Sequence, residues 1–259
     1  MPPAADGNNL AIAPATVNTD AGGSKLRRAC RIAQRWPSSP RAVADDALAQ
    51  AISDLLPVLI CGEASAEQAF GRAVQSLSAR LPAAMTQALR SIEDDERRHG
   101  RVLGQLCETL PPPRSQRPAR AAARFVRQIQ QRDPARHLAN IAALDAALCR
   151  VLSGVCQPGR PLARNPALLA VFDGIRRDEA RHVRISRRTA MHLGLGTDVL
   201  RHARMTVGEA FAALLLPQAA AFAALGIDET ELRQRLKASA GVAGSTDVDD
   251  GIEPEAIAS

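Results

Sequence analysis

Apolar side chains recur every three or four residues through most of this chain, which is the period of an amphipathic helix. Four long segments share the pattern, and they are separated by prolines and capping residues of the kind that typically start or stop helices. The segments are residues 45–81, 82–110, 133–153 and 165–194. The pattern therefore predicts an all-α fold with four long helices at its centre.

The remaining residues predict shorter helices and two irregular ends. We expect two further helices at about residues 198–225 and 228–238. Residues 1–40 are rich in Pro, Gly, Ala and Asn and lack an apolar period, which predicts a disordered N-terminal arm. The acidic, glycine-containing tail 241–259 is also predicted to be disordered. Residues 41–240 then form one helical domain.

The amino-acid composition favours helices over strands and excludes some classes of protein. The 259 residues include no tyrosine and only 2% aromatic residues, so side chains that favour strands are scarce. Neither an uninterrupted run of about eighteen apolar residues nor a secretory signal is evident, so we expect a cytoplasmic protein without a membrane partner. Five cysteines occur without a C-x-x-C pair, which excludes a zinc ribbon and favours reduced thiols.

One short motif occurs twice, on the second and the fourth long segment. Residues 92–99 read IEDDERRH and residues 175–182 read IRRDEARH, so both contain Asp-Glu-x-Arg-His. In a helix, a glutamate and a histidine three positions apart share one face, and here that face is the apolar one. Burial of such groups among leucines is costly unless they are paired or bind a cation. The doubled motif therefore predicts a buried metal site.

Further carboxylates lie at the depth that such a site requires. In an antiparallel pair of helices, residues that are level with each other are equally far from the turn. The candidates that meet this condition are Glu63, opposite Glu96, and Asp145, opposite Glu179. The midpoints of both pairs fall beside prolines that break helices. Glu67, one turn from Glu63, is the alternative ligand on the first helix.

This ligand set resembles that of the ferritin-like di-iron carboxylate superfamily, in which two helices each give a glutamate and two others each give Glu-x-x-His. The form Asp-Glu-x-Arg-His is most similar to that of oxygen-activating members, such as bacterial multicomponent monooxygenases. The resemblance covers about residues 45–195 and implies a ferritin-like four-helix bundle with additional C-terminal helices. Asp145 stands where the family usually has a glutamate.

The resemblance also implies roles for individual residues. The bridging and catalytic carboxylates would be Glu96 and Glu179, the metal-bound histidines His99 and His182, and the terminal carboxylates Glu63 and Asp145. Two aspartates would hold the histidines from outside and two arginines would support them, namely Asp95, Asp178, Arg98 and Arg181. The implied cofactor is a pair of iron ions, with manganese as the alternative.

The implied function is that of a di-iron oxidase or oxygenase, which uses dioxygen to oxidise a small or carrier-bound organic substrate. Three alternatives stay open: a ferroxidase or peroxide scavenger, a ferritin-like enzyme that hydroxylates transfer RNA, and a helical scaffold without metal chemistry. The absence of tyrosine argues against a tyrosyl-radical enzyme.

The net charge of +6 comes almost wholly from arginine, and a row of arginines recurs at helical spacing between the second and third long segments. This row consists of Arg117, Arg120, Arg124 and Arg127. A solvated face of a connecting helix explains it most simply. It also suits an acidic carrier or electron-donor protein, because arginine pairs well with carboxylate and phosphate oxygens. Nucleic acid is not the expected partner, since few aromatic residues are available to stack on bases.

Overall fold

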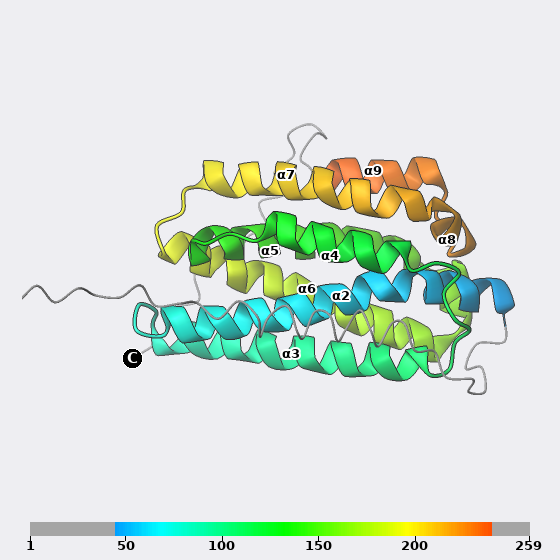
Figure 1. Cartoon of the computed structure of the whole chain (residues 1–259), viewed down its shortest axis with the longest axis horizontal. Coiled ribbons are helices and arrows are strands. Elements are labelled where there is room, and N and C mark those ends of the chain that lie inside the picture. Colours follow the sequence, from blue (N-terminus) through cyan, green and yellow to red (C-terminus); the bar gives the residue numbers. More distant parts are fainter. Residues whose placement is uncertain (1–44, 240–259) are drawn as a thin grey trace, which may run out of the picture.

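Helices form all the regular structure in residues 45–239, the part of the chain that the computed structural model describes (Figure 1). No strand occurs within that range, so the all-α prediction is confirmed for it. The arm predicted for residues 1–40 and the tail predicted for residues 241–259 lie outside the described residues. The helices are α2 (Asp46–Leu77), α3 (Ala83–Cys107), α4 (Arg117–Ile129), α5 (Pro134–Val155), η1 (Pro161–Arg164), α6 (Pro166–His192), α7 (Thr197–Leu215), η2 (Leu216–Gln218), α8 (Ala219–Ala224) and α9 (Glu229–Ser239).

Capping residues fix the starts of three long helices. Asp45 accepts hydrogen bonds from the backbone N–H groups of Ala47 and Leu48 at the start of α2. Helices α5 and α6 each begin with a proline, which has no N–H that needs a partner. The preceding Asp133 and Asn165 each accept a backbone N–H bond in the first turn. These helices therefore begin where the sequence predicts.

The turns between paired helices fall where the spacing of the acidic residues predicts. Helix α2 ends at Leu77 and α3 begins at Ala83, so the turn between them surrounds residues 79–80. The short helix η1 lies between α5 and α6 and contains Leu162, the predicted midpoint. Both predicted midpoints thus lie in the segments that connect the paired helices.

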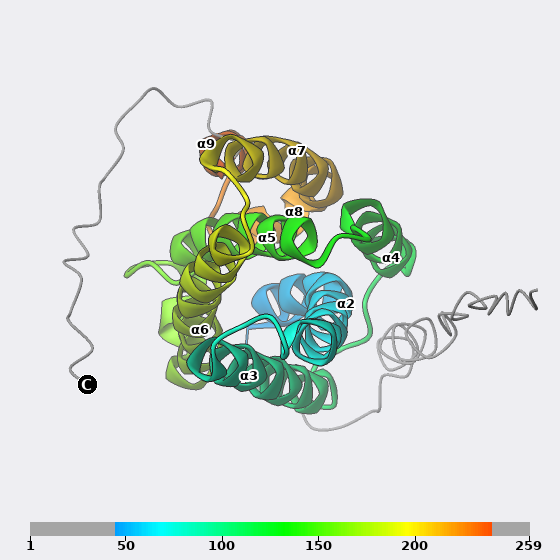
Figure 2. The same ribbon diagram turned by 90° about the vertical axis from the view of Figure 1, so that its left-hand side faces the viewer.

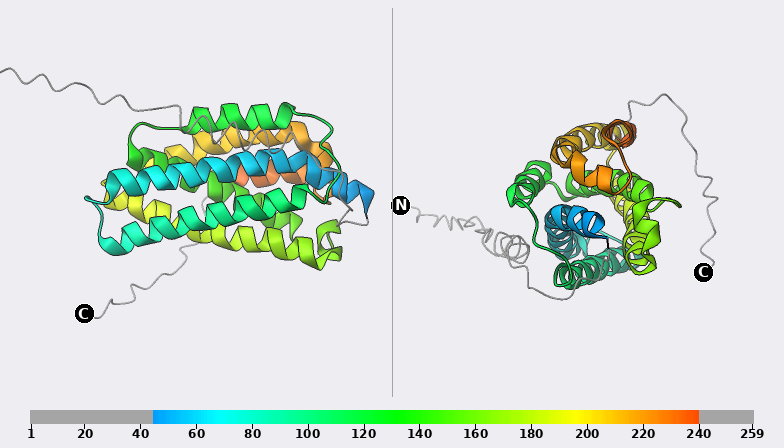
Figure 3. Two further views of the ribbon diagram at one scale, coloured as in Figure 1. Left: turned by 60° about the horizontal axis from the view of Figure 1, so that its bottom comes forward. Right: turned by 90° about the vertical axis from the view of Figure 1, so that its right-hand side faces the viewer.

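Four long helices surround the centre of the molecule. Helix α2 packs along α3, α5 packs along α6, and α3 also contacts α6 (Figure 2). Helices α7 and α9 form a layer over α5, while α4 lies against α2 (Figure 3). Helix α2 contacts α3, α4, α5 and α8, and so lies in the interior.

Helix α4 has two different faces. Its buried side chains include Ala122, Phe125 and Val126. The other face carries the predicted arginine row, whose four members are all exposed: Arg117, Arg120, Arg124 and Arg127. A role of this row in docking an acidic partner stays a prediction.

The C-terminal helices are more interrupted than the sequence predicts. One helix is expected over about residues 198–225, but α7 ends at Leu215 and is followed by η2 and α8. Pro217 lies in η2, and proline disrupts an α-helix because it lacks a backbone N–H and its ring clashes with the preceding turn. The break lets α8 pack against α2, and Phe222 of α8 is buried.

The core consists of two apolar clusters with a polar layer between them. The larger cluster includes Leu56 and Leu103, and the smaller includes Phe70 and Leu89. On each of α2, α3, α5 and α6, the candidate ligands lie between buried residues of the larger cluster and buried residues of the smaller cluster. The candidate ligands are therefore enclosed by apolar side chains on both sides.

Three helical stretches are long and apolar enough to cross a membrane, judged by length and composition alone: Asp46–Leu77, Pro134–Val155 and Thr197–Ala224. In the structure, 67% and 61% of the apolar windows in the first two are buried inside the protein, whereas the third buries 33%. Other helices thus cover most of the apolar surface of α2 and α5. The expected absence of a membrane partner stays a prediction.

Helix α9 packs so closely on α5 that a methyl group has no room at Gly154. A β-carbon at this position would lie 2.6 Å from Nε of Arg235 and 2.8 Å from Cδ1 of Ile227. Arg235 is held in place, because its guanidinium pairs with Glu231 at 2.7 Å and donates to the carbonyl of Arg150 at 3.2 Å. We expect Gly154→Ala to lower the free energy of unfolding by about 1–3 kcal/mol in urea denaturation.

Gly104→Ala on α3 is the matched control. Apart from the helix's own backbone, no atom lies within 4 Å of a β-carbon at Gly104. Alanine is favoured over glycine inside a helix by about 1 kcal/mol, so this substitution is expected to raise the free energy of unfolding. Equal stabilisation by both substitutions would show that the tight contact between α5 and α9 is absent.

Candidate metal centre

Six candidate ligands from four helices meet in the polar layer, and each has at most 4% of its surface exposed. Their ligand atoms form two groups, within each of which all atoms lie within 4.8 Å of one another. The first group contains Glu63 of α2, Glu96 and His99 of α3, and Glu179 of α6. The second contains Asp145 of α5 with Glu179 and His182 of α6. These buried groups could hold metal ions, and Glu179 belongs to both.

The two motif glutamates lie between the two imidazole rings. Glu96 places one carboxylate oxygen 3.9 Å from Nδ1 of His99 and the other 3.1 Å from Nδ1 of His182. Glu179 does the same, with distances of 3.9 Å and 3.4 Å. The centroids of the two rings are 6.0 Å apart. Each glutamate thus has one carboxylate oxygen near each histidine.

The structure distinguishes the two candidate carboxylates of α2. Oε2 of Glu63 lies 3.2 Å from Nδ1 of His99 inside the buried group. Glu67, one turn further along the helix, forms an ion pair at 3.2 Å with the exposed Arg97. The geometry therefore favours Glu63 over Glu67 as the member of the site from α2.

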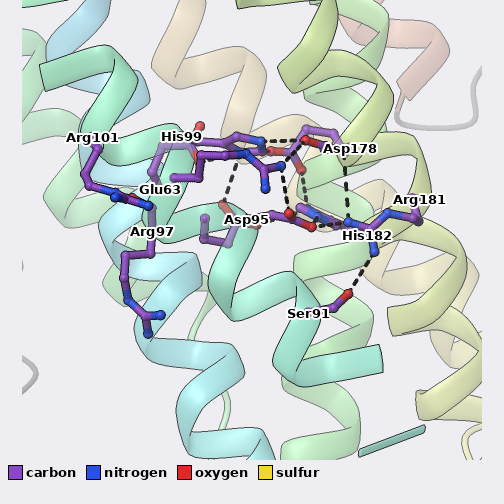
Figure 4. A network of polar contacts seen from close by, with 12 residues as sticks. Glu63, Ser91, Asp95, Arg97, His99, Arg101, Asp178, Arg181 and His182 are labelled. Carbon is purple, nitrogen blue, oxygen red and sulfur yellow. Dashed lines mark hydrogen bonds and ion pairs between the residues drawn. The ribbon is translucent and has the colours of Figure 1, made fainter. Parts of the chain in front are cut away.

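The second nitrogen of each imidazole is held by the aspartate of the opposite motif. Nε2 of His99 lies 3.0 Å from Oδ2 of Asp178, and Nε2 of His182 lies 3.3 Å from Oδ2 of Asp95 (Figure 4). Helices α3 and α6 thus brace each other's histidines. A neutral imidazole that donates from Nε2 to an aspartate presents the lone pair of Nδ1 to a cation.

Two arginines tie these aspartates together at the edge of the site. Nη2 of Arg98 lies 2.7 Å from Asp95 and 2.8 Å from Asp178. Arg181 pairs with Asp95 and donates to Oγ of Ser91 at 3.0 Å (Figure 4). The arginines are partly exposed, so this outer layer lies between the histidines and solvent. Sequence reasoning missed Ser91, because a serine on a helix has no spacing that marks it.

Burial and neighbouring carboxylates disfavour the ionisation of Glu96, Asp145 and Glu179. Burial, followed by the charge of Glu179, raises the pKa of Glu96 well above its ordinary value. Burial and the charges of Glu179 and Glu63 raise the pKa of Asp145 in the same way. Burial alone would lower the pKa of His99, but the hydrogen bond and charge of Glu63, the hydrogen bond to Asp178 and the charge of Glu179 together raise it to about 9. The site thus has a negative potential that attracts cations.

The polar atoms at the centre fit a pair of divalent cations. Within residues 45–239, four buried atoms there lack a hydrogen-bond partner: Oε1 of Glu96, Oδ2 of Asp145, Oε2 of Glu179 and Nδ1 of His182. Some of these atoms approach one another closely but not with hydrogen-bond geometry. Buried polar atoms are normally satisfied, so their convergence indicates a ligand. Two divalent ions would also balance the charges of the four carboxylates while both histidines stay neutral.

An apolar cavity borders the carboxylates of the site. Its volume is about 90 Å³, and among the described residues its polar lining consists of Glu63, Glu96, Asp145 and Glu179. Apolar side chains of α2, α4, α5, α6, α7, α8 and η1 form the rest of the wall, and the two histidines do not line it. Sequence reasoning missed this cavity, because its wall comes from helices whose packing leaves no local spacing in the sequence.

Comparisons of the chain with protein-family models, with curated proteins and with solved structures give no match. The class of protein is therefore defined by the fold and the site: a helical protein whose buried carboxylates and histidines could hold metal ions. The resemblance to the ferritin-like superfamily rests on the doubled motif.

Proposed function

We propose that this protein is a non-haem di-iron oxidase or oxygenase, and that α2, α3, α5 and α6 form a ferritin-like four-helix bundle. The observation that carries the proposal is the position of Glu96 and Glu179, each of which directs one oxygen towards each histidine. Carboxylates so placed suit two metal ions a short distance apart, as in ferritin-like di-iron proteins. Iron is the proposed metal because mixed carboxylate and imidazole ligands suit it, with manganese as the alternative.

The residues of the chain provide the setting for oxygen chemistry. When bound, a pair of ferrous ions supplies the first two electrons for the reduction of dioxygen. Glu63 and Asp145 would each hold one ion, and Asp95 and Asp178 would fix the tautomers of the metal-bound imidazoles. All four carboxylates border the apolar cavity, so a molecule in that cavity lies beside them and is shielded from water.

The cavity favours an organic substrate over iron as the substrate. A hydrated ion needs polar groups along its path, whereas the wall beyond the carboxylates is apolar. We therefore place substrate oxidation ahead of ferroxidase or peroxide-scavenging activity. Insertion of one oxygen atom, with reduction of the other to water, takes two electrons from the substrate and two from an external reductant. An electron-donor protein is accordingly the expected partner of an oxygenase of this kind.

Anaerobic loading with Fe(II), followed by mixing with oxygen, tests this function. The unaltered chain is expected to bind two Fe(II) ions and then to show a transient visible absorbance while oxygen is consumed. Glu96→Ala is expected to bind fewer ions and to show no such absorbance. Glu93→Ala is the matched control, since Glu93 lies on the same helix and pairs with the exposed Arg97. The proposal fails if the loaded chain leaves oxygen unconsumed, or if Glu96→Ala behaves like the unaltered chain.

A further inference from the structure

The cavity beside the carboxylates is long and narrow. On α5 its wall runs from Leu144 to Val155, which corresponds to roughly 16 Å along the helix axis. On α2 the wall runs from Ala66 back to Ile52, and this is the end of the molecule where α2 begins and α5 ends. A volume of about 90 Å³ spread over such a length leaves room only for a slender group.

The shape favours an unbranched chain over a ring. The space open to the centre of a water-sized sphere is about 90 Å³ and extends over about three helical turns, so the channel is narrow, and a ring or a branched group would force packed core side chains apart. An unbranched chain fits because it can follow the channel with few side-chain movements.

The chemistry of the wall favours hydrocarbon. Beyond the four carboxylates, the lining residues that belong to the described part of the chain have no side chain that can form a hydrogen bond. A hydroxyl or amide group at that depth would lose its hydrogen bonds to water without replacement. Methylene groups gain free energy when they leave water for such a wall.

At the end of the channel far from the carboxylates, the lining side chains have little accessible surface. Val155, Leu162 and Phe172 line that end and are buried. Nearer the carboxylates, Leu59 and Leu148 keep some accessible surface. A chain that enters from the carboxylate side therefore has its free end among the buried residues.

We propose that this channel binds the unbranched aliphatic chain of the substrate, with the terminal methyl group at the buried end and carbon atoms nearer the head group beside Glu63 and Asp145. The inference rests on the proposed function, because it identifies the class of organic compound that the metal site would oxidise. The positions of Val155 and Phe172 limit the length of chain that fits.

Binding of unbranched alcohols tests the inference without any oxygen chemistry. A fluorescent unbranched polyene fatty acid is bound to the whole chain and then displaced by primary alcohols of increasing length. Affinity is expected to rise about fourfold with each added methylene, the usual gain on burial, and to level off once the alcohol reaches the buried end. Cyclohexanol is expected to displace the probe far less well than hexanol.

Two substitutions in the wall locate the bound chain. Leu148→Trp fills the channel within one turn of Asp145 and is expected to weaken binding of every alcohol by about tenfold. Val155→Phe fills the far end and is expected to move the levelling-off to shorter alcohols while short alcohols still bind. Leu200→Trp is the matched control, since Leu200 is a partly buried leucine that packs against the other apolar cluster.

If a variant fails to fold, the alcohol-binding measurements on the unaltered chain are enough to test the inference. An affinity that is independent of chain length, or cyclohexanol that binds as tightly as hexanol, overturns the inference. Chain-length dependence without oxygen consumption by the iron-loaded protein would refute the proposed function and leave the ligand class standing. Oxygen consumption without chain-length dependence would refute the ligand class alone.

Discussion

Glu96→Gln is expected to make the protein less stable than the unaltered chain when metal is bound, but not when metal is removed. In the presence of a chelator, burial and the charge of Glu179 disfavour the ionised form of Glu96, and a neutral amide avoids that cost, so the free energy of unfolding should stay unchanged or rise by about 1 kcal/mol. With Mn(II) at a thousandfold excess over its dissociation constant, the unaltered chain should gain about 4 kcal/mol and the variant much less. Urea denaturation under both conditions measures the difference.

The control for this experiment is Glu93→Gln, the same exchange one turn earlier on α3. Glu93 pairs with Arg97 at 2.9 Å at the edge of the helix. Glu93→Gln should therefore change the free energy of unfolding by about the same small amount with chelator and with metal. If Glu96→Gln destabilises the protein equally with chelator and with metal, Glu96 is an ordinary structural residue and the role assigned to it is wrong.

Asp178→Asn and Asp95→Asn are each expected to weaken the binding of one metal ion about 10- to 100-fold. The aspartate charge makes the imidazole a better ligand and holds its ring in place, and asparagine keeps the shape but loses the charge. Calorimetric titration with Mn(II) measures the affinities. Asp94→Asn is the matched control, because the side chain of Asp94 is 70% exposed and lies outside the site.

Each aspartate contacts the histidine of the other motif, which gives this prediction a second readout. Asp95 of α3 contacts His182 of α6, so Asp95→Asn should shift the imidazole NMR signals of His182 more than those of His99. Asp178→Asn should do the reverse. Shifts confined to the histidine of the same motif would mean that α3 and α6 do not face each other as described.

Helical periodicity explains how much of the site the sequence could predict. Glu96 and His99 had to share the apolar face of their helix because they are three residues apart, and the same holds for Glu179 and His182. Asp145 could be predicted as a ligand because it is as far in sequence from Leu162 as Glu179 is. The structure places it in a buried group with Glu179.

Other features depend on tertiary packing and could not be predicted. Which histidine Asp95 contacts is set by the rotation of α3 relative to α6, and no local pattern records that rotation. The channel needs α4, α7 and α8 to lie over α2 and α5, and the break at Pro217 is part of that arrangement. The apolar positions of these helices show that they are buried, but not which partner covers them.

Anomalous diffraction at the iron edge, from crystals soaked anaerobically with Fe(II), tests the central claim most directly. We expect two peaks roughly 3.5–4 Å apart in the polar layer, one beside Nδ1 of each of His99 and His182, with Glu96 and Glu179 between them. Absence of iron from this layer, with Nδ1 of both histidines bound to no ion and ions found only on the surface, would contradict it.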